Sequence, residues 1–252
     1  MTHAADLPKP LGFPKCRKCA YVRIGSPDVC AECAMQTFRP LAEYHCGICS
    51  QDLSGPGEKC RNIICQWGAR QRCFTRVDAI AMFAGALEEA IKRFKYEGYV
   101  GWGLIFGRLI VGWLNAHEDD VDDVDLILGN PTALDRTPVR HIEIMMKSAY
   151  LEDGRGRWPI VAPDSPVLVK DRETDKSAGK GKSWSIKMEA ARQHADALRL
   201  RQSVEGKRVL LVDDIFTTGA TFHAVGKRLT VEWGAAEVRG LVLARVPFGI
   251  VG

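Results

Sequence analysis

The sequence predicts an α/β fold with a mainly parallel sheet, preceded by a small cysteine-rich module. Short apolar runs alternate with helical patterns over residues 76–252, as in parallel sheets that are covered by helices. All nine cysteines lie between Cys16 and Cys73, and none follows. We therefore expect two domains, a cysteine-rich module at 1–75 and a larger α/β domain at 76–252.

Composition indicates a globular protein. A chain of 252 residues with 46% hydrophobic residues can bury a substantial core, and a net charge of +4 permits a polyphosphate or nucleic-acid partner without requiring one. The first 15 residues lack the apolar run of a signal peptide. The most apolar later stretch, residues 102–114, is short and interrupted by Arg108. We expect a soluble cytoplasmic protein without a membrane span.

The cysteines are arranged in close pairs. Random placement would give about 0.3 Cys-x-x-Cys pairs in such a chain, whereas three occur. Pairs at this spacing suit tetrahedral zinc, and cytosolic proteins rarely hold disulfides. Sequential pairing predicts a double zinc-binding module with two structural ions. One would bind Cys16, Cys19, Cys30 and Cys33, and the other Cys46, Cys49, Cys60 and Cys65.

Other uses of these cysteines stay open. They include a redox dithiol, an iron–sulfur cluster, an interleaved ligand pairing, and Cys73 in place of Cys65. Basic residues beside the pairs permit contact with nucleic acid, or simply keep a small zinc module solvated. These residues are Lys15, Arg17, Lys18, Arg61, Arg70 and Arg72.

The α/β domain is expected to begin with a strand at residues 77–84, at the edge of this domain. Apolar residues at helical spacing then predict a helix whose basic residues, Lys95 among them, lie on its outer side. Glycines from Gly98 to Gly103 end this helix, and residues 104–114 form a second one. The acidic run at 118–125 is interpreted as a solvated loop rather than a metal site.

A second strand is predicted at residues 126–128, ending in the turn Gly129-Asn130-Pro131-Thr132. Arg136, Arg140 and His141 follow this turn. They either face a ligand or begin the next helix in solvent.

A third strand is predicted at residues 167–169, and a polar, basic loop follows at 170–182. Such a loop can close over a charged ligand, or it can have no role. A helix at 184–198 and a last strand near 238–244 complete the pattern.

Residues 209–221, read as VLLVDDIFTTGAT, form the centre of the domain. Four apolar residues predict a strand buried on both faces, and Asp213 and Asp214 follow at its carboxyl end. A threonine-rich loop then leads into a helix that ends near Gly234. Ligands of α/β sheets bind at the carboxyl ends of the strands.

This order of residues suits a phosphorylated sugar. A helix N-terminus offers free N–H groups to phosphate, Gly219 permits a close backbone approach, and threonine hydroxyls add donors. Two adjacent carboxylates suit sugar hydroxyls, or Mg²⁺ carried by a polyphosphate. Since the acids end a strand, we expect them outside the core. The alternative is a buried strand followed by an ordinary Asx-type cap and turn.

The thirteen residues resemble the phosphoribosyl-pyrophosphate (PRPP) motif of type I phosphoribosyltransferases. The resemblance implies a sheet of that kind in residues 76–252, and Mg²⁺ bound together with PRPP. It implies that Asp213 and Asp214 hold the ribose hydroxyls. It also implies that five residues surround the 5′-phosphate of PRPP or a nucleotide monophosphate, namely Thr217, Thr218, Gly219, Ala220 and Thr221.

A second resemblance joins the two halves of the chain. Cysteine pairs followed by a helix that ends in Lys95-Tyr96-Glu97-Gly98 resemble the ComF family of bacterial competence proteins. Such proteins usually have a Pro-Val-Pro-like turn where this chain has Asn130-Pro131-Thr132. The resemblance implies a role in DNA uptake or DNA processing, with single-stranded DNA and a DNA helicase as partners of the zinc module.

Two functions follow from these patterns. The chain either binds PRPP or a nucleotide within a DNA-handling system, or it is an active phosphoribosyltransferase of nucleotide or base metabolism. An active enzyme would displace pyrophosphate with a nitrogen nucleophile and rely on charge stabilisation. The sequence assigns no catalytic residue and no acceptor base. The few residues after the last strand leave little room for a base-binding hood.

Overall fold

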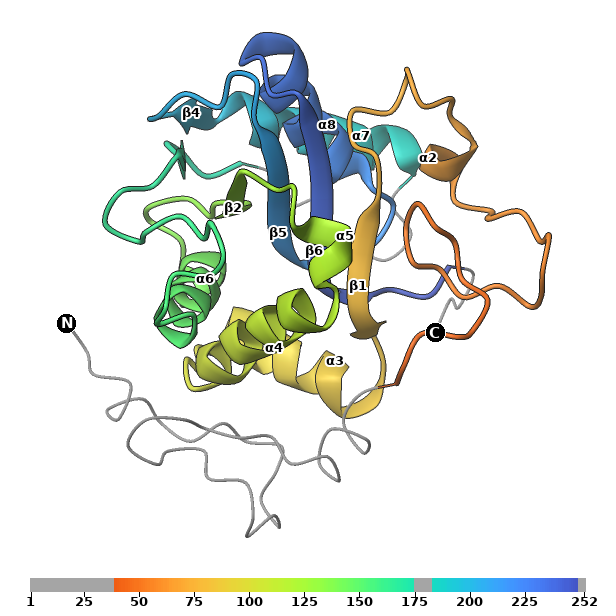
Figure 1. Ribbon diagram of the computed structural model, residues 1–252, viewed down its shortest axis with the longest axis horizontal. Coiled ribbons are helices and arrows are strands. Elements are labelled where there is room, and N and C mark those ends of the chain that lie inside the picture. Colours follow the sequence, from red (N-terminus) through yellow and green to blue (C-terminus); the bar gives the residue numbers. More distant parts are fainter. Residues whose placement is uncertain (1–38, 175–182, 249–252) are drawn as a thin grey trace, which may run out of the picture.

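A computed structural model describes residues 39–174 and 183–248 (Figure 1). Four parallel strands form the central sheet in the order β1-β6-β5-β2. They are β1 (Val77–Met82), β2 (Leu126–Gly129), β5 (Arg208–Phe216) and β6 (Glu237–Arg245). The predicted mainly parallel α/β fold is confirmed. The strand expected at residues 77–84 is β1, which lies at the edge of this sheet.

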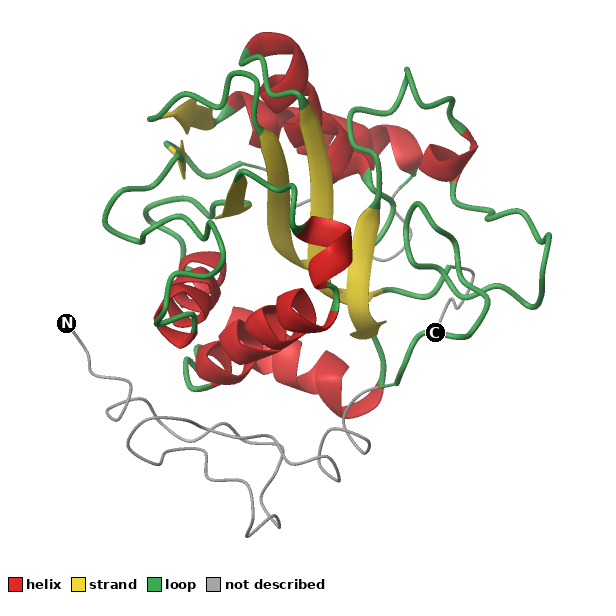
Figure 2. Ribbon diagram, in the orientation of Figure 1, coloured by secondary structure: helices red, strands yellow, loops and turns green. Residues whose placement is uncertain are grey.

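Alternate residues of β5 face two helical layers, one on each side of the sheet (Figure 2). Leu210 and Val212 pack in one core with α3, α4 and α6, while Val209 and Leu211 pack in another with α7 and α8. This alternation explains the uninterrupted apolar run, because successive side chains of a strand point to opposite faces. These helices are α3 (Gly85–Lys92), α4 (Trp102–Ala116), α6 (His141–Glu152), α7 (Trp184–Asp196) and α8 (Ala220–Lys227). Within the described ranges, no helix is long and apolar enough to cross a membrane.

The helix after β1 does not end where α3 ends. It continues as the π-helical turn η2 (Arg93–Glu97) and stops at Gly98, whose φ of 76° is the left-handed conformation that glycine adopts readily. A π-helical turn rotates the following side chains relative to an α-helix. The prediction that Lys95 lies on the outer side is therefore wrong. Its side chain is 16% exposed and points to the carboxyl end of β5.

The strand predicted at 167–169 exists, but it lies outside the parallel sheet. It is β3 (Leu168–Lys170), and it pairs in antiparallel fashion with β4 (Leu198–Leu200) in a separate two-stranded sheet. The sequence had placed residue 198 in the preceding helix, which ends at Asp196. Strands of three residues carry too little periodicity to reveal their partner.

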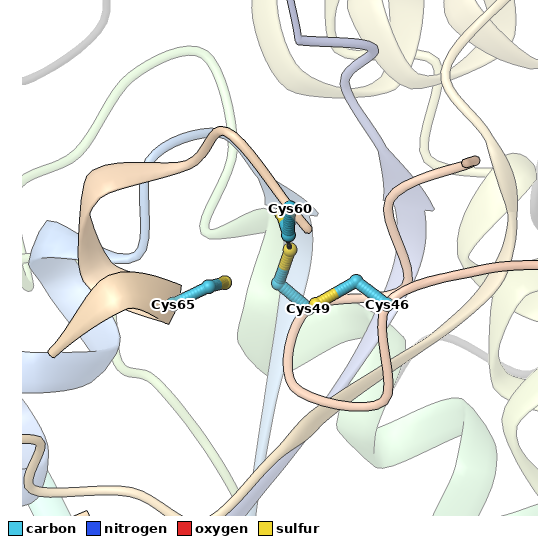
Figure 3. Close-up of side chains that lie close together, drawn as sticks. All are labelled: Cys46, Cys49, Cys60 and Cys65. Atoms are coloured by element: carbon cyan, nitrogen blue, oxygen red, sulfur yellow. Dashed lines mark hydrogen bonds between the residues drawn. The ribbon is translucent and has the colours of Figure 1, made fainter. Parts of the chain in front are cut away.

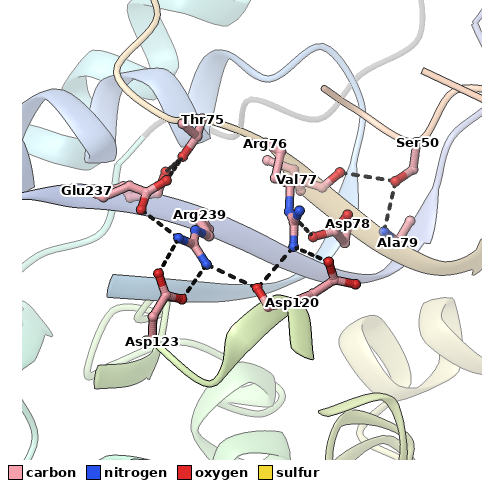
Figure 4. Close-up of polar contacts among 11 residues, drawn as sticks. Ser50, Thr75, Arg76, Val77, Asp78, Ala79, Asp120, Asp123, Glu237 and Arg239 are labelled. Atoms are coloured by element: carbon pink, nitrogen blue, oxygen red, sulfur yellow. Dashed lines mark hydrogen bonds and ion pairs between the residues drawn. The ribbon is translucent and has the colours of Figure 1, made fainter. Parts of the chain in front are cut away.

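The acidic run is largely exposed to solvent, as expected, but it is not entirely a loop. Its first residues form the short helix α5 (Glu118–Val121), and two of its acids bind arginines of the sheet (Figure 4). Arg239 donates to both carboxylate oxygens of Asp123 at 2.7 and 2.8 Å, and Arg76 donates to the backbone carbonyl of Asp120 at 3.2 Å. Two parallel hydrogen bonds fix the geometry of an arginine–carboxylate pair. The run therefore attaches α5 to β1 and β6.

Part of the cysteine segment lies directly on the sheet (Figure 4). The Ser50 hydroxyl donates to the carbonyl of Val77 and accepts from the N–H of Ala79, both at 3.1 Å. Cys49, Ile64 and Phe74 are buried in the same core as α7 and α8. Residues 39–74 thus share a core with the sheet. The domain limits at 1–75 and 76–252 stay a prediction.

A last helical piece completes the described fold. Helix α8 is followed by the π-helical turn η3 (Arg228–Glu232), and Gly234 adopts a φ of 74° as the helix stop expected there. The short helix α2 (Ile63–Gln66) lies in the cysteine segment and carries Cys65.

Candidate functional site

The loop between β5 and α8 has the geometry that the motif predicts. Gly219 adopts a φ of 86° immediately before α8 begins at Ala220. A side chain at Gly219 would meet the Phe216 ring at 2.8 Å and Ile64 at 2.9 Å. The loop therefore needs glycine both for its conformation and for space. It presents the first turn of α8, with its free backbone N–H groups, at the carboxyl end of the central sheet.

The two acids of the motif have different partners. Asp214 is only 3% exposed, and its Oδ2 contacts the Lys95 ammonium and lies 3.1 Å from His141 Nε2. Asp213 is half-buried, and its Oδ2 accepts a 2.8 Å hydrogen bond from the Asn130 amide. The expectation that both acids lie outside the core is wrong for Asp214.

These environments move the two pKa values apart. Burial, reinforced by the neighbouring Asp214 carboxylate, raises the pKa of Asp213 to about 7. Burial also opposes ionisation of Asp214, but the Lys95 ammonium and His141 outweigh it and hold the pKa of Asp214 below its usual range. Burial lowers the pKa of His141, so this ring is neutral at pH 7 and donates its Nε2–H to Asp214. The acid pair therefore carries one firm negative charge and one that titrates near neutrality.

A relay of two side chains orients Asn130. His194 on α7 lies 2.7 Å from Asn130 Oδ1, and Asn130 Nδ2 in turn donates to Asp213. Burial, with a smaller effect of Lys170, lowers the pKa of His194 to about 3. The neutral ring donates to the amide oxygen, which turns the amide nitrogen of Asn130 toward Asp213.

The acids, the loop and several cations line one cavity. Thr217, Thr221, Arg136 and Lys170 all line it. His141 lines this cavity as well, whereas Arg140 instead binds Glu143 at 2.9 Å. Of the three residues after the turn, Arg136 and His141 therefore face the cavity, as expected of ligand-facing residues, and Arg140 does not. A cavity with carboxylates and cations suits a ligand that has both hydroxyl and phosphate groups.

Sequence reasoning missed the roles of three residues of this cavity. The sequence places Lys95 on the outer side of its helix, assigns no role to His194, and gives Asn130 only as part of a turn, whereas Lys170 begins the basic loop expected to close over a charged ligand. The position of Asn130 directly after a strand was a usable signal, because carboxyl ends of neighbouring parallel strands meet at one edge. Lys95 and His194 come from the helical elements η2 and α7.

The described cysteine quartet lies together, on the side of the sheet that α8 covers (Figure 3). The sulfur atoms of Cys46, Cys49, Cys60 and Cys65 all lie within 4.8 Å of one another. Cys46 and Cys49 come from one tight turn, in which Ser50 N donates to the carbonyl of Cys46 at 2.8 Å. Cys73 is not part of this group, and Cys16, Cys19, Cys30 and Cys33 lie outside the described residues.

The geometry of this quartet fits a tetrahedral metal. Sulfurs bound to zinc at about 2.3 Å would be separated by about 3.8 Å, and the sulfurs of Cys49 and Cys60 are 3.7 Å apart. The buried Asn62 amide lies 4.0 Å from Cys49 Sγ and can donate to a thiolate there. Four cysteines without disulfide bonds, close enough for one ion, are the donor set that structural zinc prefers.

Comparisons with known proteins agree with this geometry. Residues 160–249 match the phosphoribosyl transferase domain family. The competence protein ComFC of Streptococcus pneumoniae is 25% identical over 224 residues, which cover 86% of this chain and 87% of that protein.

Two solved structures are also similar. One is a hypoxanthine phosphoribosyltransferase from Staphylococcus aureus, with 15% identity and a TM-score of 0.32, covering 57% of this chain and 62% of that enzyme. The other is a purine phosphoribosyltransferase from Pyrococcus horikoshii, with 15% identity and a TM-score of 0.31, covering 57% of this chain and 83% of that enzyme.

The family match over residues 160–249, the parallel sheet and the loop after β5 agree with one another and point to a fold of the phosphoribosyl transferase kind. The cysteine quartet before the sheet is the second part of the pattern. Together with the relative that spans most of the chain, these features fit a ComF-type protein.

Proposed function

We propose that this chain binds PRPP or a nucleotide monophosphate in the cavity at the carboxyl end of β5. The observation that carries the proposal is the loop itself, in which a left-handed Gly219 leads directly into the N-terminus of α8, beside two carboxylates. The 5′-phosphate would lie on the loop formed by Thr217, Thr218, Gly219, Ala220 and Thr221. The ribose hydroxyls would lie toward Asp213 and Asp214.

The two acids would contribute unequally. Oδ2 of Asp214 already contacts Lys95 and His141. These contacts fix the carboxylate group, so its Oδ1 is less free to bind a sugar hydroxyl. Asp213 is half-buried and accepts one side-chain hydrogen bond, from Asn130. We therefore assign the main contact with ribose to Asp213. Mg²⁺ would accompany a polyphosphate ligand, and Arg136 and Lys170 on the cavity wall would offset its charge.

The quartet Cys46, Cys49, Cys60 and Cys65 would hold one structural zinc ion, and the first four cysteines would hold the second. Zinc in such a site is closed to substrate and contributes folding energy. We further propose that the protein acts in DNA uptake or processing, in the cytoplasm, with single-stranded DNA or a helicase as partner of the zinc module. The support for this role is the name of the curated relative together with the cysteine module.

Calorimetry tests the ligand. PRPP with Mg²⁺ and ribose 5-phosphate should each bind the full chain with a stoichiometry near one, and adenosine without phosphate should not bind. Absence of heat with both phosphorylated probes would exclude the proposal. Release of pyrophosphate from PRPP in the presence of candidate bases then separates an active transferase from a binding protein.

A gel-shift series with the full chain tests the DNA role. Binding of a single-stranded oligonucleotide should weaken steeply as the salt concentration rises, because phosphate contacts release counterions. If no shift occurs at low salt with zinc present, the DNA partner is wrong, whatever the result for PRPP.

A further inference from the structure

Arg245 connects the cysteine quartet to the loop after β5. This last residue of β6 is fully buried, at 0% exposure. Its Nη1 donates to the backbone carbonyls of Phe216 and Thr217 at 3.3 and 2.9 Å. Its Nη2 lies 3.7 Å from the sulfur of Cys49. One guanidinium group therefore touches both the predicted metal site and the first residues of the phosphate loop.

The charge of Arg245 needs a partner. A buried guanidinium cannot lose its proton, and an unpaired buried charge is strongly unfavourable. Among the residues that the structure describes, Arg245 donates to backbone carbonyls and to Cys49, and no carboxylate pairs with it. A divalent ion held by four thiolates has a net negative charge. The loaded quartet is thus the counter-charge that this arginine requires.

A second contact joins the same two sites. Ile64 lies in α2, between Cys60 and Cys65, and is 0% exposed. Its Cγ2 is 2.9 Å from the position that a side chain at Gly219 would occupy, so Ile64 packs directly against the left-handed turn of the loop. The Phe216 ring, 4.9 Å from the Arg245 guanidinium, also lies under Gly219. The loop therefore rests on groups whose positions depend on the quartet.

We propose that Arg245 is a positioning residue that couples the metal-loaded quartet to the phosphate-binding loop. The metal centre holds Nη2, and Nη1 holds the carbonyls of Phe216 and Thr217. This fixes the direction in which the loop and the first turn of α8 present their N–H groups. The inference rests on the proposed function, because it assumes that a phosphorylated ligand binds at this loop.

Coupling of this kind is reciprocal. If the metal increases the affinity for a phosphorylated ligand, the ligand must increase the affinity for the metal by the same factor. The coupling is visible without any catalysed reaction, either as ligand affinity with and without metal or as metal affinity with and without ligand.

The test uses the full chain loaded with Co²⁺, whose thiolate absorption reports the metal site. Competition with a chelator gives the metal affinity, with and without saturating ribose 5-phosphate and PRPP with Mg²⁺. A variant with Cys46→Ser and Cys65→Ser identifies which part of the absorption comes from this quartet. In the parent, the ligands should tighten Co²⁺ binding about tenfold and shift the absorption of the quartet.

Two variants remove the link. Arg245→Met deletes the guanidinium, and Arg245→Lys keeps the charge but cannot reach two carbonyls and a sulfur at once. Both should retain metal at the quartet, bind ribose 5-phosphate about tenfold more weakly, and lose the effect of ligand on metal affinity. Arg239→Met is the matched control, because Arg239 lies on the same strand but binds Asp123 and Glu237. It should leave both affinities unchanged.

Outcomes separate this proposal from the proposed function. If the parent binds neither phosphorylated probe, the proposed function fails and the coupling fails with it. If the parent binds them, but Arg245→Lys binds equally well and still links ligand to metal, only the coupling is wrong. Should Arg245→Met not fold, the comparison of metal-loaded and chelated parent, together with Arg245→Lys, still decides the matter.

Discussion

Lys95 forms an ion pair with Asp214 although the two residues are 119 positions apart in the chain. The Asp214 side chain is buried, at 4% exposure, and that of Lys95 is largely covered, at 16%. This pair attaches the π-helical turn η2 to the carboxyl end of the central strand β5. It also sets the charge of the acid pair before any ligand arrives.

Removal of Lys95 should therefore destabilise the fold. Lys95→Met leaves Asp214 buried without its cation, and we expect a loss of about 3 kcal/mol in the free energy of unfolding. Lys92→Met is the control, because its exposed ion pair with Glu88 should contribute no more than about 0.5 kcal/mol. Urea denaturation of both variants at pH 7 gives the comparison. Equal losses would show that the Lys95 pair is no more important than a surface pair.

Asp213 should make stability fall as the pH rises. Its pKa is raised to about 7 in the folded chain from an ordinary 3.8, so the folded state holds a proton that the unfolded state releases. This contribution is fully present below pH 3.8 and is lost as the pH rises to about 7. Asp213→Asn removes the effect, and its stability relative to the parent should grow by up to about 1.4 kcal/mol per pH unit across this window.

Thermal denaturation at a series of pH values from 4 to 8 measures this difference. Asp122→Asn, at an exposed acid of the acidic run, serves as the control and should follow the parent. A constant difference between Asp213→Asn and the parent at every pH would contradict the raised pKa.

Thr218→Val should weaken the phosphate end of the site. The change deletes a hydroxyl at nearly constant volume, and a hydrogen bond to a charged group contributes about 1.5–3 kcal/mol. Affinity for ribose 5-phosphate, and for inorganic phosphate where it is measurable, should fall about tenfold or more. Asp213→Asn should instead spare inorganic phosphate.

Thr230→Val is a matched control, since the Thr230 hydroxyl bonds the Gly226 carbonyl inside the helical segment after the loop. Calorimetry measures the affinity of Thr218→Val, Asp213→Asn and Thr230→Val for ribose 5-phosphate and for inorganic phosphate. The comparison separates contacts with the phosphate from contacts with the ribose. If Thr218→Val and Thr230→Val bind equally well, the role given to Thr218 is wrong.

The quartet should account for one zinc ion. Elemental analysis of the parent should give about two per chain if both predicted sites exist. Cys65→Ser should lose one of them, and Cys73→Ser, at a cysteine outside the quartet, should lose none. Iron in place of zinc, or equal metal content in the parent and Cys65→Ser, would contradict the assignment.

Local patterns were sufficient for the centre of the site. The apolar run of β5, the acid pair, Gly219 and the start of α8 are contiguous, so strand burial and helix geometry predict their arrangement directly. The cysteine quartet was also predictable as a group, because its spacing is itself a property of the sequence.

The remaining site residues depend on tertiary packing. Lys95 meets Asp214 across 119 positions of the chain, and His194 meets Asn130 across 64. Neither event leaves a periodic signal. The burial of Asp214 was missed for the same reason, since a strand end is exposed only if nothing covers it.

The cysteine segment also closes the open side of the sheet. Two backbone N–H groups of β1 donate hydrogen bonds to this segment. Val77 N donates to the carbonyl of Ile48, and Met82 N donates to the carbonyl of Arg39, both at 2.8 Å. An uncovered edge strand is a template for a strand of another molecule and favours aggregation. If the proposed zinc ion maintains the fold of this segment, a chain without the ion would expose β1 to such pairing. The same ion that orders a ligand loop would thus keep individual molecules apart.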